Sequence, residues 1–249
     1  DGKVALISGA SRGVGLATAR ALAHRGMRIV MTARGEARLA ASRDELAESG
    51  AEVHAVAGDV GCWDDAQAMV NAAVERFGGL DVLVNNAGVS MRGAFEDLAP
   101  EVCSQTVNTN LMGPIYLSRA ATRHIKASRG RIVFVSSIAG IVGLPGASTY
   151  CASKSALSGL SESLRLELGP AGVHVGVVYV GFTENDPEKR VLGADGGAVF
   201  PDRPAHHSQA QVADAIVGMI LKRRRQLILT PVGSIADRAH RISPAMAEG

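Results

Sequence analysis

Tyr150 and Lys154 are, by type and spacing, the residues in this sequence best suited to proton transfer. They lie four positions apart, so on a helix they share one face and the ammonium can act on the phenol. A free tyrosine has a pKa of about 10. A nearby cation stabilises the phenolate and lowers that pKa towards working pH, as general acid–base catalysis requires. Because this spacing also arises by chance on helix surfaces, it indicates catalysis only if the chain also supplies a cofactor site.

A glycine-rich turn stands where a cofactor phosphate would bind. The apolar residues 4–8 lead into Gly9-Ala10-Ser11-Arg12-Gly13-Val14-Gly15, and a helical pattern follows. Glycine lets the backbone turn sharply and approach a pyrophosphate, while the helix N-terminus offers free N–H groups and a positive dipole end. The spacing is G-x-x-x-G-x-G rather than the general G-x-G-x-x-G fingerprint. Its place in the first strand–helix unit nevertheless predicts a dinucleotide site.

The end of the second expected strand indicates which nicotinamide cofactor is used. An acidic residue there would hold the adenosine ribose hydroxyls, but the chain reads Met31-Thr32-Ala33-Arg34. Arg34 can fork onto a 2′-phosphate, with Arg12 on its other side. The alternative is that both are solvated surface arginines. The pattern therefore favours NADP(H), with NAD(H) as the alternative cofactor.

Short apolar runs alternate with helical patterns along the whole chain, which predicts a doubly wound, mostly parallel sheet of seven strands with helices on both faces. Such a Rossmann-type α/β fold would form one domain over residues 1–249. The strands are nearly all apolar, as expected where both faces are covered. We expect strands at residues 4–8, 28–32, 53–57, 82–84, 132–135, 173–179 and 227–229. We expect helices at about residues 14–24, 38–48, 64–77 and 101–126, with a kink at Pro114, and a further helix from about residue 209.

Three further segments need their own interpretation. Residues 183–208, rich in Gly, Pro and Asp, form a long insertion that we expect to act as a substrate lid, with disorder as the alternative. Residues 231–249 form a C-terminal tail. The basic run at residues 222–225 suggests an anion patch, but a helix dipole and a polar turn explain it better.

Composition narrows the classes of protein that remain. The net charge of +2 is too small to indicate nucleic acid or an anionic membrane as a partner. The cysteines at 62, 103 and 151 are odd in number and lack a CxxC pair, and the histidines lack metal-ligand spacing; no metal site is expected. No apolar run approaches the ~20 residues that span a bilayer. We expect a cytoplasmic protein, although a leader or anchor before Asp1 stays an open alternative.

Taken together, these motifs resemble the short-chain dehydrogenase/reductase family over about residues 3–230. The resemblance depends on the glycine loop, Asn85-Asn86-Ala87-Gly88, Ser136-Ser137 and the Tyr150/Lys154 pair, in that order. The joint pattern is specific, although each part alone is modest.

The resemblance implies a role for each catalytic residue. Tyr150 matches the family's acid/base, and Lys154 matches the residue that holds the nicotinamide ribose and lowers the tyrosine pKa. Ser137 matches the hydroxyl that orients the substrate oxygen, with Ser136 as the alternate. Asn110 matches the structural and proton-relay asparagine.

The resemblance also implies a set of cofactor-contacting residues. Asp59 and Val60 match the pair that contacts adenine, and the residues after the sixth strand line the nicotinamide pocket. There the family usually has Pro-Gly, whereas this chain has Val180 before Gly181, which puts the local geometry in doubt. The cofactor-binding residues implied are Gly9, Ser11, Arg12, Gly13, Val14, Gly15, Arg34, Asp59, Val60, Asn86, Ala87, Gly88, Tyr150, Lys154, Gly181 and Thr183.

The substrate pocket is expected at the carboxyl ends of the strands. Its candidate walls are mostly apolar: Met91, Phe95, Ile138, Leu144 and Phe182. An apolar pocket favours a hydrophobic carbonyl compound over a sugar phosphate.

The leading hypothesis from these features is an NADP(H)-dependent oxidoreductase. It would interconvert a carbonyl and an alcohol. A ketoacyl-thioester reductase is the alternative enzyme, and a non-catalytic NADP(H) sensor is the alternative from another class. The family's pairing of the helices that carry Asn110 and Tyr150 implies a homodimer or homotetramer. The substrate, the reaction direction and the stereochemistry are not encoded in any motif.

Overall fold

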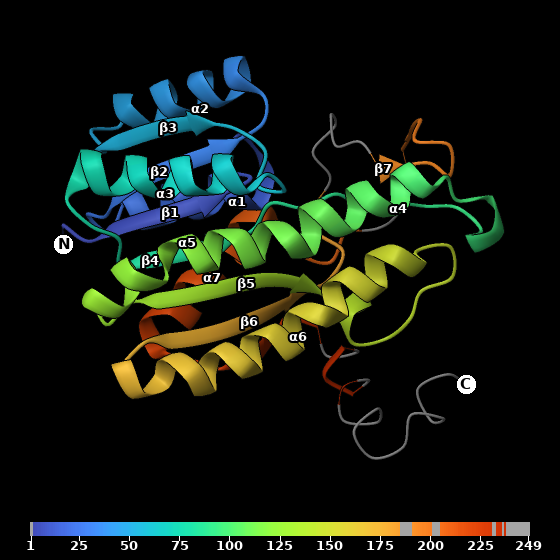
Figure 1. Cartoon of the computed structure of the whole chain (residues 1–249). Helices are drawn as coiled ribbons and strands as arrows, with labels where there is room; N and C mark the ends of the chain where they lie inside the picture. The colour runs from blue at the N-terminus through green and yellow to red at the C-terminus, as the bar shows by residue number, and fades with distance from the viewer. Residues whose placement is uncertain (1, 185–190, 201–204, 231–232, 236, 238–249) are drawn as a thin grey trace.

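A central seven-stranded sheet organises the chain in the computed structural model, which describes residues 2–184, 191–200, 205–230, 233–235 and 237. The strand order is β3-β2-β1-β4-β5-β6-β9, and every neighbouring pair is parallel. This is the predicted doubly wound arrangement, and all seven predicted strands form (Figure 1). The strands are β1 Val4–Ser8, β2 Arg28–Ala33, β3 Val53–Ala57, β4 Val82–Asn85, β5 Arg131–Ser137, β6 His174–Val180 and β9 Gln226–Ile228.

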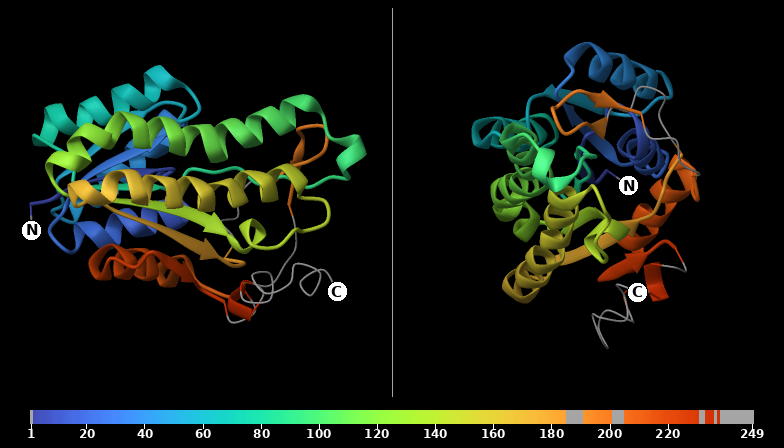
Figure 2. Two further views of the ribbon diagram at one scale, coloured as in Figure 1. Left: turned by 60° about the horizontal axis from the view of Figure 1, so that its bottom comes forward. Right: turned by 90° about the vertical axis from the view of Figure 1, so that its right-hand side faces the viewer.

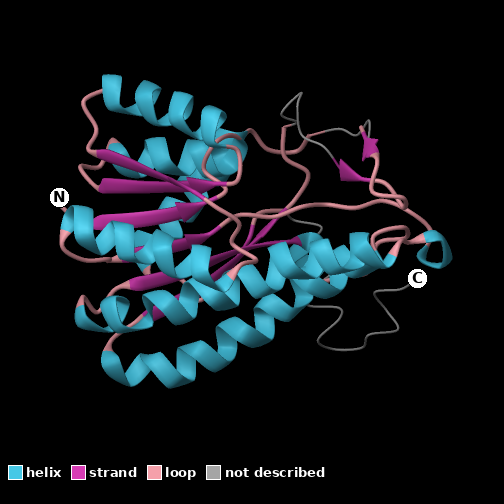
Figure 3. Ribbon diagram, turned by 45° about the horizontal axis from the view of Figure 1, so that its top comes forward, coloured by secondary structure: helices cyan, strands magenta, loops and turns pink. Residues whose placement is uncertain are grey.

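Helices cover both faces of the sheet (Figures 2 and 3). The helices are α1 Gly13–Ala23, α2 Glu36–Glu48, α3 Trp63–Phe77, α4 Pro100–Val107, α5 Gly113–Ala127, α6 Ser148–Leu168 and α7 Gln209–Lys222. Helices α3, α5 and α6 share one apolar cluster, whereas α1, α2 and α7 share the other. Within β1, Leu6 faces the first cluster and Ile7 faces the second, so successive side chains are buried on opposite faces. No helix in the described part of the chain is long and apolar enough to cross a membrane.

The predicted helix over residues 101–126 is interrupted, as expected, but the irregularity is a π-helical turn, η2 (Asn108–Met112), between α4 and α5. In a regular helix the ring of Pro114 would clash with the carbonyl four residues earlier, and it has no N–H to donate to it. The wider turn therefore lies just before the proline rather than at it.

The described part of the 183–208 insertion is structured. Strands β7 (Val191–Leu192) and β8 (Ala198–Val199) form an antiparallel hairpin, which docks on the loop after β4. Leu192 N donates to Ser90 O at 2.9 Å, and Arg92 N donates to Leu192 O at 2.8 Å. Residues 191–200 therefore fold as a docked hairpin, and the role of the insertion as a substrate lid stays a prediction. The remainder, residues 185–190 and 201–204, and most of the predicted tail lie outside the described residues.

Candidate active site

The carboxyl ends of β1 and β4 are fastened together by the hydroxyl of Ser8. It accepts hydrogen bonds from the backbone N–H groups of Asn86 and Ala87, each at 3.0 Å. The Asn86 amide nitrogen donates to the carbonyls of Ser8 and Gly9, at 2.9 and 3.2 Å. These bonds hold the glycine loop against the turn that follows β4. Sequence reasoning missed Ser8, although a buried hydroxyl at a strand end always needs partners.

The glycines in this loop are required by the space around them. A Cβ on Gly9 would lie 2.8 Å from Ala87 Cα, and one on Gly15 would collide with the Gly9 carbonyl. Gly13 has a φ of 59°, in the left-handed region that favours glycine. Helix α1 begins there, and the side chain of its N-cap, Arg12, makes no capping bond. The positive end of the helix therefore faces the loop without a capping side chain, as an anion-binding turn requires.

Lys154 is buried beneath the predicted catalytic tyrosine. It is 6% exposed, and its Nζ donates to the Val135 carbonyl at 2.9 Å. The same nitrogen lies 6.0 Å from the centroid of the half-buried Tyr150 ring. A Cβ on Gly88 would lie 3.3 Å from Nζ. This ammonium therefore lies where three elements meet: the turn after β4 (residues 86–88), strand β5 and helix α6.

Asn110, in the π-helical turn, connects α6 to the loop after β4. Its Oδ1 accepts from Val89 N at 2.8 Å, while its Nδ2 donates to Val89 O at 2.9 Å and to Ser153 Oγ at 3.1 Å. The side chain is completely buried. Ser153, which the sequence analysis passed over, in turn donates to the Tyr150 carbonyl at 2.8 Å. Asn110 thus fixes the helix that carries Tyr150.

The structure distinguishes the two serines that end β5. Ser136 is buried and its hydroxyl donates to the Lys154 carbonyl at 2.8 Å. Ser137 is half-buried, and its hydroxyl accepts from Ala139 N at 3.2 Å. The Ser136 hydroxyl therefore already donates its hydrogen bond to the backbone of α6. The geometry favours Ser137 over Ser136 for contact with a substrate.

The predicted adenine end lies at the ends of β2 and β3. Asp59 Oδ1 accepts from Gly61 N at 2.9 Å, which shapes the turn after β3. Val60 is 5% exposed and packs into the core, so only its backbone is available on this side. Arg34 is exposed at the end of β2, and Arg12 is half-buried in the glycine loop.

Val180, the departure from the family pattern, is a core residue. It is 8% exposed and packs in the cluster shared by α1, α2 and α7. The next residue is Gly181, and a Cβ added to it would lie 2.5 Å from Thr230 Cγ2. The Thr183 hydroxyl donates to the Gly181 carbonyl at 3.3 Å. Valine replaces the usual proline here without disturbing the strand.

The predicted pocket walls have different environments. Met91 is fully buried, in a cluster to which Leu144, Tyr150 and Leu192 of the docked hairpin also belong. Phe182 stacks on His206, with ring centroids 5.8 Å apart. Ile138 lies near Gly181. Phe95, in contrast, is 74% exposed. The hairpin contact through Leu192 depends on pairing across 100 residues, which no local pattern signals.

Titratable groups in the described residues do not gather into a metal site. No group of three or more His, Cys, Asp or Glu side chains among them is arranged to hold a metal ion. The chemistry that the arrangement offers is a buried ammonium, a half-buried phenol and a half-buried hydroxyl beside a glycine-lined turn.

In sequence and structure, the chain is similar to known oxidoreductases. The family model for short chain dehydrogenase matches residues 3–193. The chain is 41% identical over 188 residues to the 11-beta-hydroxysteroid dehydrogenase-like 4A of Arabidopsis thaliana, covering 74% of this chain and 62% of that protein, less than two thirds of its length. It is 36% identical over 206 residues to the 3-oxoacyl-(acyl-carrier-protein) reductase FabG of Vibrio cholerae serotype O1, covering 82% of this chain and 83% of that protein. A short chain dehydrogenase/reductase from Burkholderia phymatum, solved in complex with NAD, matches with a TM-score of 0.87 at 27% identity, over 99% of this chain and 95% of that chain.

Proposed function

This chain belongs to the short-chain dehydrogenase/reductase family, and on that premise we propose that it interconverts a ketone or aldehyde and an alcohol, with NADP(H) preferred over NAD(H). The observation that carries the proposal is the placement of Tyr150 above the buried ammonium of Lys154. A cation held at this distance stabilises a phenolate, which an acid/base tyrosine must form in each turnover.

Each of the four residues has its own role in the proposed reaction. Tyr150 donates its proton to the carbonyl oxygen during reduction and takes the hydroxyl proton during oxidation. The Ser137 hydroxyl donates a hydrogen bond to the same oxygen and stabilises its developing charge. Lys154 holds positive charge under the phenol, and Asn110 fixes the helix through Ser153. When bound, the nicotinamide supplies or accepts the hydride.

The glycine turn fits the pyrophosphate of such a cofactor. Its backbone lies against Asn86 and Ala87 with no room for side chains at Gly9 and Gly15. Gly13, Val14 and Gly15 would hold the phosphates by backbone N–H groups, Lys154 the nicotinamide ribose, and Asp59 and Val60 the adenine.

The preference for NADP(H) depends on Arg34 and Arg12. Arg34 follows β2 and Arg12 lies in the glycine loop, so both would be in reach of a 2′-phosphate, and the end of β2 carries no acid to bind a free ribose hydroxyl pair. Arg34→Ala should weaken NADPH binding by at least about tenfold, the loss expected for a charge-assisted bond, and leave NADH binding unchanged. Equal affinities of the unmodified protein for NADPH and NADH would contradict the preference.

The direct test of the function is to follow NADPH oxidation against a panel of ketones, aldehydes, quinones and acyl thioesters, with Tyr150→Phe as the paired variant. We expect Tyr150→Phe to lower kcat by about 10³-fold, within the range for a lost general acid, and to leave the cofactor dissociation constant nearly unchanged. An equally active Tyr150→Phe protein would end the assignment of Tyr150.

The same panel separates the alternatives. Selective turnover of acyl thioesters would favour a ketoacyl-thioester reductase, a reading supported by the relative from Vibrio cholerae. Cofactor binding without turnover of any carbonyl compound would favour a sensor. The buried Met91 and the half-buried Leu144, which belong to the same cluster as Tyr150, support a hydrophobic substrate.

The finer statements on cell location and assembly are proposals as well. Among the described residues the three cysteines are all free thiols, which supports a reducing compartment and hence the cytoplasm. The chain's helices α5 and α6 correspond to those that pair between subunits in the family, which supports a homodimer or homotetramer. Light scattering of the purified chain would test the assembly.

A further inference from the structure

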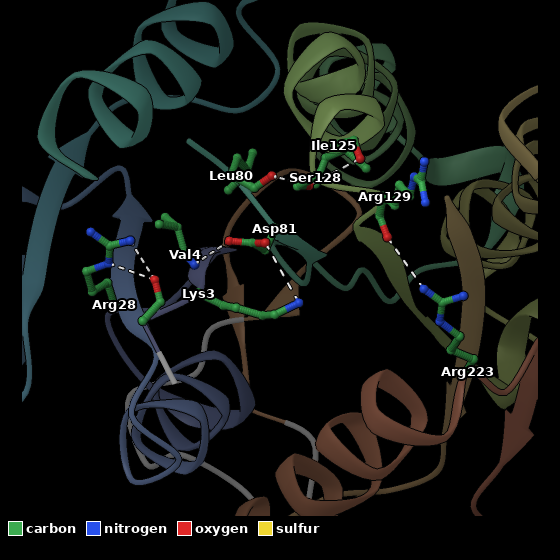
Figure 4. A network of polar contacts seen from close by, with 10 residues as sticks. Lys3, Val4, Arg28, Leu80, Asp81, Ile125, Ser128, Arg129 and Arg223 are labelled. Atoms are coloured by element: carbon green, nitrogen blue, oxygen red, sulfur yellow. Dashed lines mark hydrogen bonds and ion pairs between the residues drawn. The ribbon is translucent and has the colours of Figure 1, made fainter. Parts of the chain in front are cut away.

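A cluster of basic side chains lies at the amino edge of the sheet, on the opposite side from the candidate active site. We call it the edge cluster: Arg129, Arg131, Arg165, His174 and Arg223. Arg131 and His174 begin β5 and β6, Arg165 lies on α6, and Arg129 and Arg223 follow the last turns of α5 and α7. Figure 4 shows Arg223 reaching Arg129, whose carbonyl accepts from Arg223 Nη2 at 3.5 Å.

Two members of the edge cluster carry polar atoms that are closed off from solvent. Arg131 and His174 are paired in register on neighbouring parallel strands, so their side chains leave the same face of the sheet. Nε of Arg131 is closed off from solvent and has no hydrogen-bond partner, and the ring nitrogens of His174 are also closed off, beside the backbone of Arg223. A Cβ on Gly176 would lie 3.3 Å from the His174 ring and 3.0 Å from Met219 of α7, which places the ring beneath that helix. Buried polar atoms without partners are unusual enough to need an explanation.

The backbone is strained at the same place. Arg129 and Arg223 have φ values of 48° and 51°, and among the described residues they are the non-glycine residues with positive φ. Both follow helix ends, where glycine or asparagine is the usual choice. Strained backbone of this kind tends to gather at functional sites. Here it directs two guanidinium groups to one edge.

The charges of the edge cluster repel one another. Burial lowers the pKa of His174, and the guanidinium groups of Arg223, Arg131 and Arg165 lower it further, against the Arg223 carbonyl, which raises it. Burial and Arg223 likewise lower the pKa of Arg131, and Asp81 partly opposes them. Asp81 is already engaged, since its Oδ2 accepts from Val4 N at 2.8 Å and its Oδ1 lies 4.0 Å from Lys3 Nζ (Figure 4).

Helix dipoles account for only part of this arrangement. The C-terminal ends of α5 and α7 attract the cations Arg129 and Arg223, as the basic run at residues 222–225 led us to expect. They do not account for Arg131 and His174, which begin buried strands and lie side by side on the same face of the sheet. An anion would neutralise all of these charges together.

We propose that the edge cluster is a second ligand site, which binds a phosphate dianion or a phosphate monoester at the amino edge of the sheet. Arginine side chains suit this chemistry because their planar forks bind tetrahedral oxyanions by paired hydrogen bonds. Arg129 and Arg223 are exposed and would meet the ligand first, whereas Arg131 and Arg165 are half-buried, and Arg165 Nε also donates to the Val175 carbonyl at 3.3 Å.

The test follows the Cε1–H signal of His174 by nuclear magnetic resonance, assigned by its loss in His174→Gln. Inorganic phosphate, O-phosphoserine and sodium chloride are titrated at matched ionic strength, with NADP⁺ present to occupy the phosphate site of the cofactor. We expect a saturable shift with half-saturation on the order of 1 mM phosphate and none with chloride. Saturation by inorganic phosphate but not by O-phosphoserine would assign the site to the free ion, and saturation by both would include monoesters.

Three variants tie the signal to the edge cluster. Arg131→Gln and Arg223→Gly should each raise the half-saturating phosphate concentration by at least about tenfold. Glycine adopts the backbone of Arg223 without strain, so this variant loses the guanidinium without losing the fold. Arg25→Gln is the matched control, because Arg25 is an exposed arginine that bonds the Ala21 carbonyl near the end of α1. A shift that never saturates, an equal shift with chloride, or an equal loss in Arg25→Gln would overturn the proposal.

Discussion

The two edges of the parallel sheet use polar side chains in opposite ways. At the carboxyl edge, Ser8, Asn110 and Ser136 are buried and hydrogen-bonded to neighbouring backbone. At the amino edge, Nε of Arg131 is buried without a hydrogen-bond partner, and the neighbouring His174 ring is buried among arginines. Between the two edges lie the two apolar clusters that cover the faces of the sheet, so the contrast arises at the ends of the strands.

This difference shows that the backbone of a site can be held by one set of residues while its reactive side chains stay available for a substrate. At the carboxyl edge, the fully bonded residues hold the turns, and the half-buried Tyr150 and Ser137 are left to meet a substrate. At the amino edge, Asp81 and Ser128 are bonded to backbone in the same way, but the charges of Arg131 and Arg223 lie beside them and repel each other. We therefore expect substitutions at the carboxyl edge to alter activity strongly, and those at the amino edge to alter stability and its dependence on pH.

After Tyr150→Phe, the largest effect should distinguish Ser137 from Ser136. Ser137→Ala should lower kcat by about 10²-fold, because it removes a hydrogen bond to the developing oxyanion. Ser136→Ala should retain most activity and lower the free energy of unfolding by about 1 kcal/mol, through loss of the bond to the Lys154 carbonyl. Steady-state kinetics and urea unfolding measure the two quantities. A greater loss of kcat in Ser136→Ala would reverse the assignment.

Gly15→Ala should disrupt the glycine turn. The added Cβ would collide with the Gly9 carbonyl and lie 2.5 Å from Asn86 Nδ2, so we expect stability to fall by about 1–3 kcal/mol and cofactor affinity by at least tenfold, an order-of-magnitude figure for a displaced phosphate contact. Gly35→Ala is the control, since nothing lies within 4 Å of its Cβ position. Calorimetric titration with NADPH and thermal unfolding give the comparison, and equal behaviour of the two variants would show that the turn tolerates side chains.

At the amino edge, Arg223→Gly should stabilise the protein by about 1 kcal/mol, because it relieves a left-handed backbone and removes a repelling charge. Arg225→Gly, where φ is not positive, should instead be neutral or slightly destabilising. Urea unfolding at neutral pH and low phosphate would measure both. Destabilisation by Arg223→Gly would mean that its guanidinium holds the edge together.

The smallest effect concerns pH. The pKa of His174 in the folded protein lies below the ordinary value of 6.5, so the unfolded chain binds its proton more readily. The corresponding stability is present above about pH 6.5 and is lost as pH falls towards the folded pKa. His174→Gln should therefore reduce the loss of stability that sets in as the pH falls below about 6.5. His124, whose pKa is also lowered, is present in both proteins, so their difference isolates His174.

Much of the fold was predictable because it depends on local pattern. Apolar runs located all seven strands to within two or three residues, and the glycine spacing located the turn that Gly9 and Gly15 make. The Tyr150–Lys154 pair followed from helix periodicity. The packing of the ammonium under the phenol in the structure is consistent with that prediction.

The features that were not predictable depend on contacts between distant segments. Local periodicity could not reveal that Arg131 would lie beside His174, since their pairing depends on strand register across 43 residues. The hairpin at residues 191–199 is fixed by pairing with the loop after β4, and its own sequence resembles a structureless insertion. The choice between Ser136 and Ser137 needed the direction of each hydroxyl.

The π-helical turn at Asn108–Met112 also sets the rotational phase between α4 and α5. A helix places about 3.6 residues in each turn, so one residue corresponds to about 100° of rotation. Deleting a single residue from this turn would rotate α4 by about that angle relative to α5. Val102 and Thr106, both buried, would then turn away from the interior. The length of this segment is therefore as constrained as the identity of Asn110 within it.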